Sequence, residues 1–159
     1  MRYIFLLVAT VLVVSSCDKV EVPASKQEML RNGQWMLTSG STKVYNAATK
    51  KYDTTAIVID ECKKDDRLVF RENYDGVHTP GENRCNASET AEMPFRWGLL
   101  DDDRKMYIYD GKSFFNLDVN AEVKEFTEGS FTITYNQYTT VDNVPRTDTV
   151  MYTMTFKKI

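Results

Sequence analysis

The stretch that decides the fold is FRWGLLDDDRKMYIYDG, residues 95–111, in which large apolar side chains return at every second position. The returning positions are Phe95, Trp97 and Leu99 before the charged segment DDDR, and Met106 and Ile108 after it. A period of two is typical of a strand with one buried face, and a charged segment between two such runs is typical of a hairpin tip. Asp110-Gly111 adds a second hairpin signal, so the stretch predicts two antiparallel strands with a third following.

The same period recurs through most of the chain, between segments rich in turn-forming residues. Further strands are expected near residues 35–37, 43–45, 52–59, 68–70, 115–119, 131–135 and 150–156. Eight or nine short strands in succession, rich in β-branched and aromatic residues, are typical of an antiparallel barrel or sandwich. Because a barrel leaves no open sheet edge, we expect an all-β, up-and-down barrel of about eight strands.

One short helix is expected before the first strand. Ser25 and Glu28 have the spacing of a capping box, in which each residue bonds the backbone of the other. Gly33 follows as a residue able to end the helix in a left-handed conformation. The sequence therefore predicts a helix over residues 26–32.

The N-terminus carries an export signal. Arg2 precedes an apolar run over residues 4–14, interrupted only by Thr10, which is too short to span a hydrocarbon core of about 30 Å. Val14-Ser15-Ser16-Cys17 then resembles a bacterial lipobox, which implies a lipid on the Cys17 thiol and cleavage just before it. An ordinary cleaved secretory signal and an uncleaved anchor are the two alternatives.

On this basis the chain divides into a lipoprotein signal peptide (1–16), a polar tether (17–24) and one barrel domain (25–159). The full chain has 20 basic and 23 acidic side chains, and removal of Arg2 leaves 19 against 23, a charge of about −4. This balance excludes nucleic acid as a partner. We expect the membrane to be contacted through the lipid anchor, in the cell envelope and at the outer membrane, with the face left open.

The cysteine count also fits an exported protein. With Cys17 carrying lipid, Cys62 and Cys85 remain as a pair in an oxidising compartment, where a disulfide is expected. Two buried free thiols are the alternative. A zinc site is a weaker interpretation, because two isolated cysteines do not complete its ligand shell.

Several motifs together resemble a known family. Gly33-x-Trp35 after a short helix resembles the start of the lipocalin fold. Cys62-Lys63-Lys64-Asp65-Asp66, a strand with Leu68-x-Phe70, a turn at Asp75-Gly76, and Cys85 before the Trp97 strand resemble the lipocalin-like lipoproteins of Gram-negative bacteria. The resemblance covers about residues 29–159 and implies a lipocalin-like barrel at the end of a lipid-anchored tether.

The apolar positions of the strands predict the barrel interior. They are Trp35, Leu37, Phe70, Phe95, Trp97, Phe115, Phe131, Tyr135, Tyr152 and Phe156. A small barrel of eight strands is just wide enough to be filled by side chains or to hold one small ligand. The leading expectation is non-catalytic binding of a small apolar or amphipathic molecule. The alternative is a filled barrel that binds an envelope protein through its outer face, for which Tyr107, Tyr109 and Tyr138 are suited.

Catalytic chemistry finds little support in the sequence. His78 is the single histidine and is interpreted as a solvated loop residue, because no nucleophile motif accompanies it. Asp101, Asp102 and Asp103 are interpreted as a wet hairpin tip rather than a cation site. Asp65 and Asp66 are expected to cap the Cys62 corner and pair with a nearby Lys or Arg. We expect no catalytic residue, metal or cofactor.

Overall fold

The computed structural model describes residues 24–111, 114–115, 117–141 and 144–159, and the backbone alone for residues 138–141 and 144–148. Within these ranges one helix, α1 (Lys26–Arg31), and a 3₁₀ turn, η1 (Glu61–Lys63), accompany nine strands. The strands are β1 (Gln34–Asn46), β2 (Lys51–Ala56), β3 (Arg67–Phe70), β4 (Asp75–Thr79), β5 (Met93–Leu100), β6 (Lys105–Gly111), β7 (Leu117–Phe126), β8 (Ser130–Val141) and β9 (Val144–Lys158).

Eight of these strands close into a barrel. The strand order is β2-β1-β3-β4-β5-β6-β7-β8-β9, and β1 also pairs with β9, so the sheet joins its own far end and leaves β2 outside. Every pairing is antiparallel, from Trp35 opposite Leu68 on one side of β1 to Trp35 opposite Lys158 on the other. The expected all-β, lipocalin-like up-and-down barrel is confirmed.

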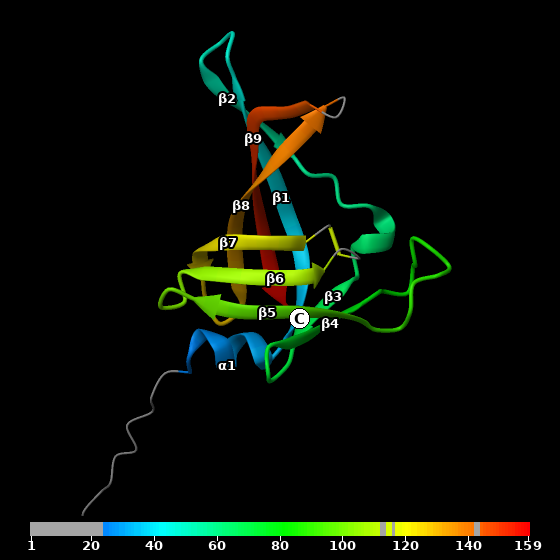
Figure 1. The fold of residues 1–159 in the computed structure, drawn as a ribbon. Helices are drawn as coiled ribbons and strands as arrows, with labels where there is room; N and C mark the ends of the chain where they lie inside the picture. Colours follow the sequence, from blue (N-terminus) through cyan, green and yellow to red (C-terminus); the bar gives the residue numbers. More distant parts are fainter. Residues whose placement is uncertain (1–23, 112–113, 116, 142–143) are drawn as a thin grey trace, which may run out of the picture.

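The barrel has two differently oriented walls (Figure 1). Strands β5, β6 and β7 run across the view, whereas the long strands β1, β8 and β9 cross them steeply. The β1–β2 and β8–β9 hairpins extend past the body of the barrel at the end opposite α1. The molecule therefore has a helix-covered end and an end with two projecting arms.

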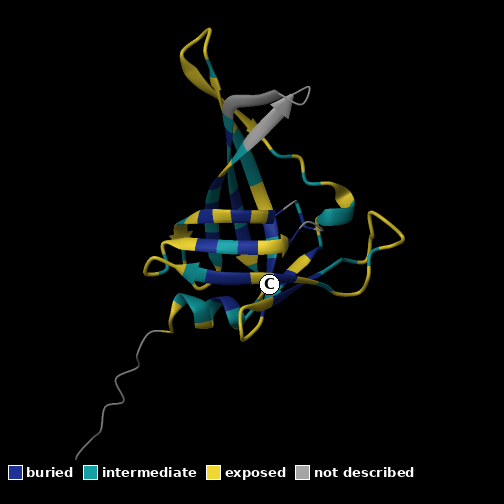
Figure 2. Cartoon of the chain, in the orientation of Figure 1, coloured by how far each residue is buried: buried dark blue, intermediate teal, exposed yellow. Residues whose placement is uncertain are grey.

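Alternation of buried and exposed residues builds the core, as the stripes along β5, β6 and β7 show (Figure 2). In β5, Phe95 and Trp97 are buried while Arg96 between them is exposed, as a strand with one inward face requires. The largest fully buried side chains are Trp35, Trp97, Phe70, Phe114, Phe131 and Phe156.

Helix α1 covers one end of the barrel. The predicted capping box is present, with the Ser25 side chain accepting from the Glu28 N–H and the Glu28 carboxylate accepting from the Ser25 N–H. Leu30 is fully buried, and its carbonyl accepts from Trp35 Nε1 at 2.8 Å. The prediction for Gly33 is wrong, because Asn32 ends the helix with φ −89° and no glycine in the described ranges has positive φ.

Two turn predictions are also corrected. Gly76 lies inside β4, and the left-handed residues of the preceding turn are Asn73 and Tyr74. Gly76 is needed for space, since a Cβ there would lie 2.3 Å from the Phe95 ring. Gly111 still pairs with Leu117, so Asp110-Gly111 is a bulged strand end rather than the turn itself.

No helix in the described part of the chain has the length and apolarity needed to cross a membrane.

Candidate functional site

The barrel interior is packed ring against ring. Trp35 and Phe131 meet with ring centroids 5.0 Å apart, and Phe131 stacks on Phe156 at 4.6 Å. Phe70 contacts both Trp97, at 5.0 Å, and Phe131, at 6.0 Å. Contacts of this kind join strands from both walls, so these rings fill the barrel next to the helix-covered end.

Most of the residues expected inside are buried. Those with less than a tenth of their surface exposed are Trp35, Leu37, Phe70, Phe95, Trp97, Phe131, Tyr135 and Phe156. Tyr152 is half-buried and stacks on Tyr135 at 5.1 Å. Phe115 is displaced from the expected strand: it lies in the turn before β7 with φ 51°, and packs on the core from the side. The neighbouring Phe114 supplies the fully buried ring.

A buried polar cluster lies at the side of the barrel, where the interpretation of His78 as a solvated loop residue is wrong. His78 is on β4 and fully buried, and its Nε2 donates to Asp66 Oδ2 at 2.7 Å. Asp66 is also fully buried and accepts from Gly81 N at 3.0 Å. Lys63 Nζ lies 3.2 Å from the same carboxylate and 2.8 Å from Glu89.

This cluster holds Asp66 ionised. Burial alone would raise the pKa of Asp66, but hydrogen bonds from His78 and Gly81 and the charges of His78 and Lys63 outweigh it, so the pKa lies below its ordinary value. The expected pairing of Asp66 with a nearby lysine is present, whereas Asp65 accepts from Glu82 N at 2.8 Å.

The Cys62–Cys85 disulfide joins the same corner to the following loop, with the Cα atoms 5.1 Å apart, as predicted from the cysteine count. Together the disulfide, the Asp66–His78 pair and the Lys63–Glu89 ion pair fasten β4 and the loop after it to the turn before β3. The arrangement is that of a structural clamp. Sequence reasoning missed the Asp66–His78 pair within it, because the two residues lie 12 positions apart around a corner.

The outer wall of β5 and β6 carries two outward-facing tyrosines, of which Tyr109 is exposed and Tyr107 is half-buried. Met106 and Ile108 point inward, so Tyr107 and Tyr109 point outward, and Arg96 is their neighbour on β5. Tyr74 lies beside β5, where its carbonyl accepts from Trp97 N at 3.0 Å. Tyr74 and Tyr109 are 54% and 40% exposed. We call Tyr74, Arg96, Tyr107 and Tyr109 the tyrosine face.

The tyrosine face is held in a fixed arrangement. The rings of Tyr107 and Tyr109 are stacked with centroids 5.1 Å apart, and the Tyr109 hydroxyl donates to Asn120 at 3.0 Å. Gly98 gives the Tyr107 ring room, because a Cβ at this position would lie 2.5 Å from it. Burial, followed by the phenols of Tyr74 and Tyr109, raises the pKa of Tyr107.

An ion pair orients the cation of the tyrosine face, with Arg96 Nη1 donating to Asp75 Oδ1. Held in this way, the tyrosine rings and the arginine guanidinium form a preorganised contact surface. Tyr and Arg are residue types that dominate protein interfaces. The third tyrosine expected to be exposed, Tyr138, has a side chain outside the described residues.

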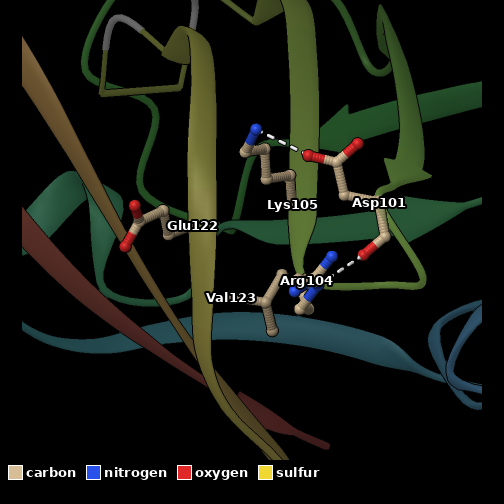
Figure 3. A pocket seen from close by; sticks show the side chains of 5 residues that line it. All are labelled: Asp101, Arg104, Lys105, Glu122 and Val123. Atoms are coloured by element: carbon tan, nitrogen blue, oxygen red, sulfur yellow. Dashed lines mark hydrogen bonds and ion pairs between the residues drawn. The ribbon is translucent and has the colours of Figure 1, made fainter.

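A hollow of about 460 Å³ lies near the predicted hairpin tip of residues 101–104 (Figure 3). Its charged groups already have partners: Lys105 Nζ lies 2.6 Å from Asp101 Oδ2, and Arg104 Nε donates to the Asp101 carbonyl at 2.9 Å. Glu122 pairs with Lys124. Asp101, Asp102 and Asp103 all have positive φ, as residues of a tight tip. Among the described residues, no group of three or more His, Cys, Asp or Glu side chains is placed to hold a metal ion.

The fold and surface together define a class: a closed, antiparallel, eight-stranded β-barrel with a packed interior, one added edge strand and an ordered aromatic patch on its outer wall. Comparison with known protein families, with curated proteins and with solved structures found no match. The predicted signal peptide, Cys17 and the rest of the predicted tether up to residue 23 lie outside the described residues.

Proposed function

We propose that this chain is a non-catalytic lipoprotein of the bacterial cell envelope, anchored in the outer membrane by lipid on Cys17. Its barrel works through its outer wall, as an accessory or inhibitory module that binds another envelope protein. The observation that carries the proposal is the tyrosine face, in which the exposed, hydrogen-bonded ring of Tyr109 stacks on the half-buried ring of Tyr107 beside an oriented arginine.

The packed interior supports this choice over a carrier of a small ligand. A carrier needs space inside the barrel, and at the level of Trp35, Phe131 and Phe156 the described rings contact one another directly. A ligand entering there would have to displace buried aromatic side chains, each of which contributes several kcal/mol to the core. The outer wall offers contact area without that cost.

The chemistry of the tyrosine face fits a protein partner. Tyr and Arg are enriched at the residues that contribute most to binding, because they combine a large apolar area with a polar end. The rings of Tyr107 and Tyr109 are already ordered by stacking and by Asn120, so little side-chain entropy is lost on binding.

The anchor and the tyrosine face are compatible. From Cys17 to Ala24 the chain makes seven Cα-to-Cα steps, which extend over at most about 25 Å. Ala24 leads directly into α1, so the helix-covered end is the one attached to the tether. The tyrosine face lies on the side wall, where a neighbouring envelope protein can reach it.

Site-specific photo-crosslinking in cells tests the proposal. A photoreactive phenylalanine analogue placed at Tyr109 or Tyr74 is expected to give the same discrete protein adduct. The matched control position is Val58, which is 85% exposed and lies away from the tyrosine face. Equal labelling at all three positions, or none at Tyr109 and Tyr74, would refute a protein-binding role for this face. A stoichiometric small molecule in native mass spectrometry of the purified protein would favour the carrier instead.

A further inference from the structure

Strand β2 forms an open edge outside the closed barrel. In the described part of the chain β2 pairs with β1 alone, and all six of its residues are exposed. The β1–β2 hairpin projects beyond the barrel body (Figure 1), so the outer edge of β2 is accessible along its length. An accessible strand edge is a template for pairing with another strand.

The hydrogen bonding of the hairpin tells which backbone groups face this edge. Ile57 N donates to Gly40 O at 2.8 Å, which makes Ile57 and Gly40 a hydrogen-bonded pair. Since such pairs alternate along an antiparallel ladder, Lys51, Asp53 and Thr55 direct their N–H and C=O groups toward β1. Tyr52, Thr54 and Ala56 consequently direct theirs toward the open edge.

We propose that β2 pairs antiparallel with β2 of a second copy of this chain, with Tyr52 opposite Tyr52 on the two-fold axis. In this register the edge-facing groups of Tyr52 meet their own copies as a hydrogen-bonded pair. Registers shifted by one residue are excluded, because they oppose edge-facing groups to groups already directed toward β1. The contact is isologous, as in most homodimers.

Charge favours pairing on Tyr52 over the other allowed registers. Lys51 lies opposite Asp53 of the second copy, and by symmetry this ion pair forms twice on one face of the joined sheet. The next allowed register would place Asp53 opposite Asp53, two carboxylates of like charge. Pairing on Thr54 would place Lys51 opposite Ile57 and Asp53 opposite Thr55, so that no ion pair forms across the contact. Asn46 Nδ2 donates to Asp53 Oδ2 at 2.8 Å, and this hydrogen bond holds the Asp53 carboxylate against its own hairpin.

The other face of the hairpin would cover exposed aromatic surface. Tyr45 and Tyr52 are 49% and 62% exposed, and their rings meet edge to face at 5.4 Å. Pairing on Tyr52 joins the two ring pairs into one row of four tyrosines. Because the strands are antiparallel and the hairpins project from the barrels, the two barrels lie at opposite ends of the joined strands.

Disulfide trapping in the full-length chain, solubilised in detergent, tests the register. Tyr52→Cys places two thiols on residues whose Cα atoms are about 5.5 Å apart, within the range of a disulfide. The matched control is Thr55→Cys, exposed on the same strand, whose copies would lie far apart. Under mild oxidation the Tyr52→Cys chain should form a covalent dimer at least tenfold faster than the Thr55→Cys chain. The rate measured for the chain without an added cysteine is subtracted from both rates.

Charge exchange in the Tyr52→Cys chain tests the ion pairs. Lys51→Asp alone opposes two carboxylates, Asp53→Lys alone opposes two ammonium groups, and each should slow trapping about tenfold. The double change restores opposite charges and should restore the rate. Equal trapping at positions 52 and 55, insensitivity to the single changes, or failure of the double change to restore the rate would each overturn the proposal.

Discussion

Replacement of Asp66 by asparagine should cost the barrel about 3 kcal/mol of unfolding free energy at neutral pH. The substitution keeps the size of the side chain and removes its charge. Asp66 accepts from His78 Nε2 at 2.7 Å and from Gly81 N at 3.0 Å, and lies 3.2 Å from Lys63 Nζ. An amide offers only one oxygen to these three donors and directs its own N–H₂ toward one of them.

The magnitude follows from burial. Breaking a buried ion pair by removing one partner costs about 3–5 kcal/mol, since the other partner is left without compensation. The side-chain carbonyl oxygen of asparagine keeps one of the contacts, so the expected loss lies at the lower end of this range. With a denaturant slope of about 1.5–2 kcal/mol per molar, the urea midpoint should fall by about 1.5–2 M.

The pH dependence has a definite sign. The folded-state pKa of Asp66 is lowered from its ordinary value of 3.8, so its contribution to stability is complete above that value. The contribution is lost as the pH falls through the lowered folded-state pKa, where the carboxylate is protonated. The variant lacks this titration, so the gap in stability between the two proteins should narrow below about pH 4.

Urea unfolding followed by tryptophan fluorescence measures both effects, because Trp35 and Trp97 are fully buried and become exposed together. Unfolding at pH 7, 5, 4 and 3 gives the gap as a function of pH. Asp65→Asn is the matched control, because Asp65 is the neighbouring carboxylate but bonds only the loop at Glu82. A loss below about 0.5 kcal/mol at pH 7, or a gap that stays constant down to pH 3, would refute the assigned role of the cluster.

Three further predictions follow from other features. Cys62→Ser with Cys85→Ser should lower stability by about 3 kcal/mol, the loop-closure entropy for a separation of 23 residues, and unfolding with and without reductant measures it. Cys17→Ala should move the protein from the membrane to the soluble fraction; unchanged partitioning would contradict lipidation at this residue. Gly98→Ala should displace the Tyr107 ring and abolish the photo-adduct at Tyr109, while the far-ultraviolet circular dichroism stays that of the barrel. An undiminished adduct would show that Gly98 is not needed for the binding surface.

The sequence predicted the strands wherever one face is buried and the other is wet. In residues 95–111 the alternation identified Phe95, Trp97, Met106 and Ile108 as inward, and all four are buried. The pattern failed at Phe115, because a turn between β6 and β7 breaks the period and moves the buried position to Phe114. The local period of the sequence does not reveal that the buried position moves by one residue.

Strand β4 shows a second limit of sequence patterns. Gly76, Val77 and His78 are all buried, so this strand has no exposed face to produce an alternation. His78 occupies an inward position that apolar residues usually take, and only the distant carboxylate of Asp66 makes that position acceptable. The outward direction of Tyr107 and Tyr109 was predictable, whereas the contribution of Tyr74 depends on two left-handed residues in one turn.

The seam between β1 and β9 sets a condition on how this protein can be made. Trp35 on β1 is paired with Lys158 on β9, so the sheet cannot close until β9, the last strand of the barrel, has been made. Contacts so distant in sequence make folding slow, and the barrel cannot be completed until β9 is available to pair with β1. A nascent chain lacking β9 would present two unpaired long edges, at β1 and β8, to its surroundings.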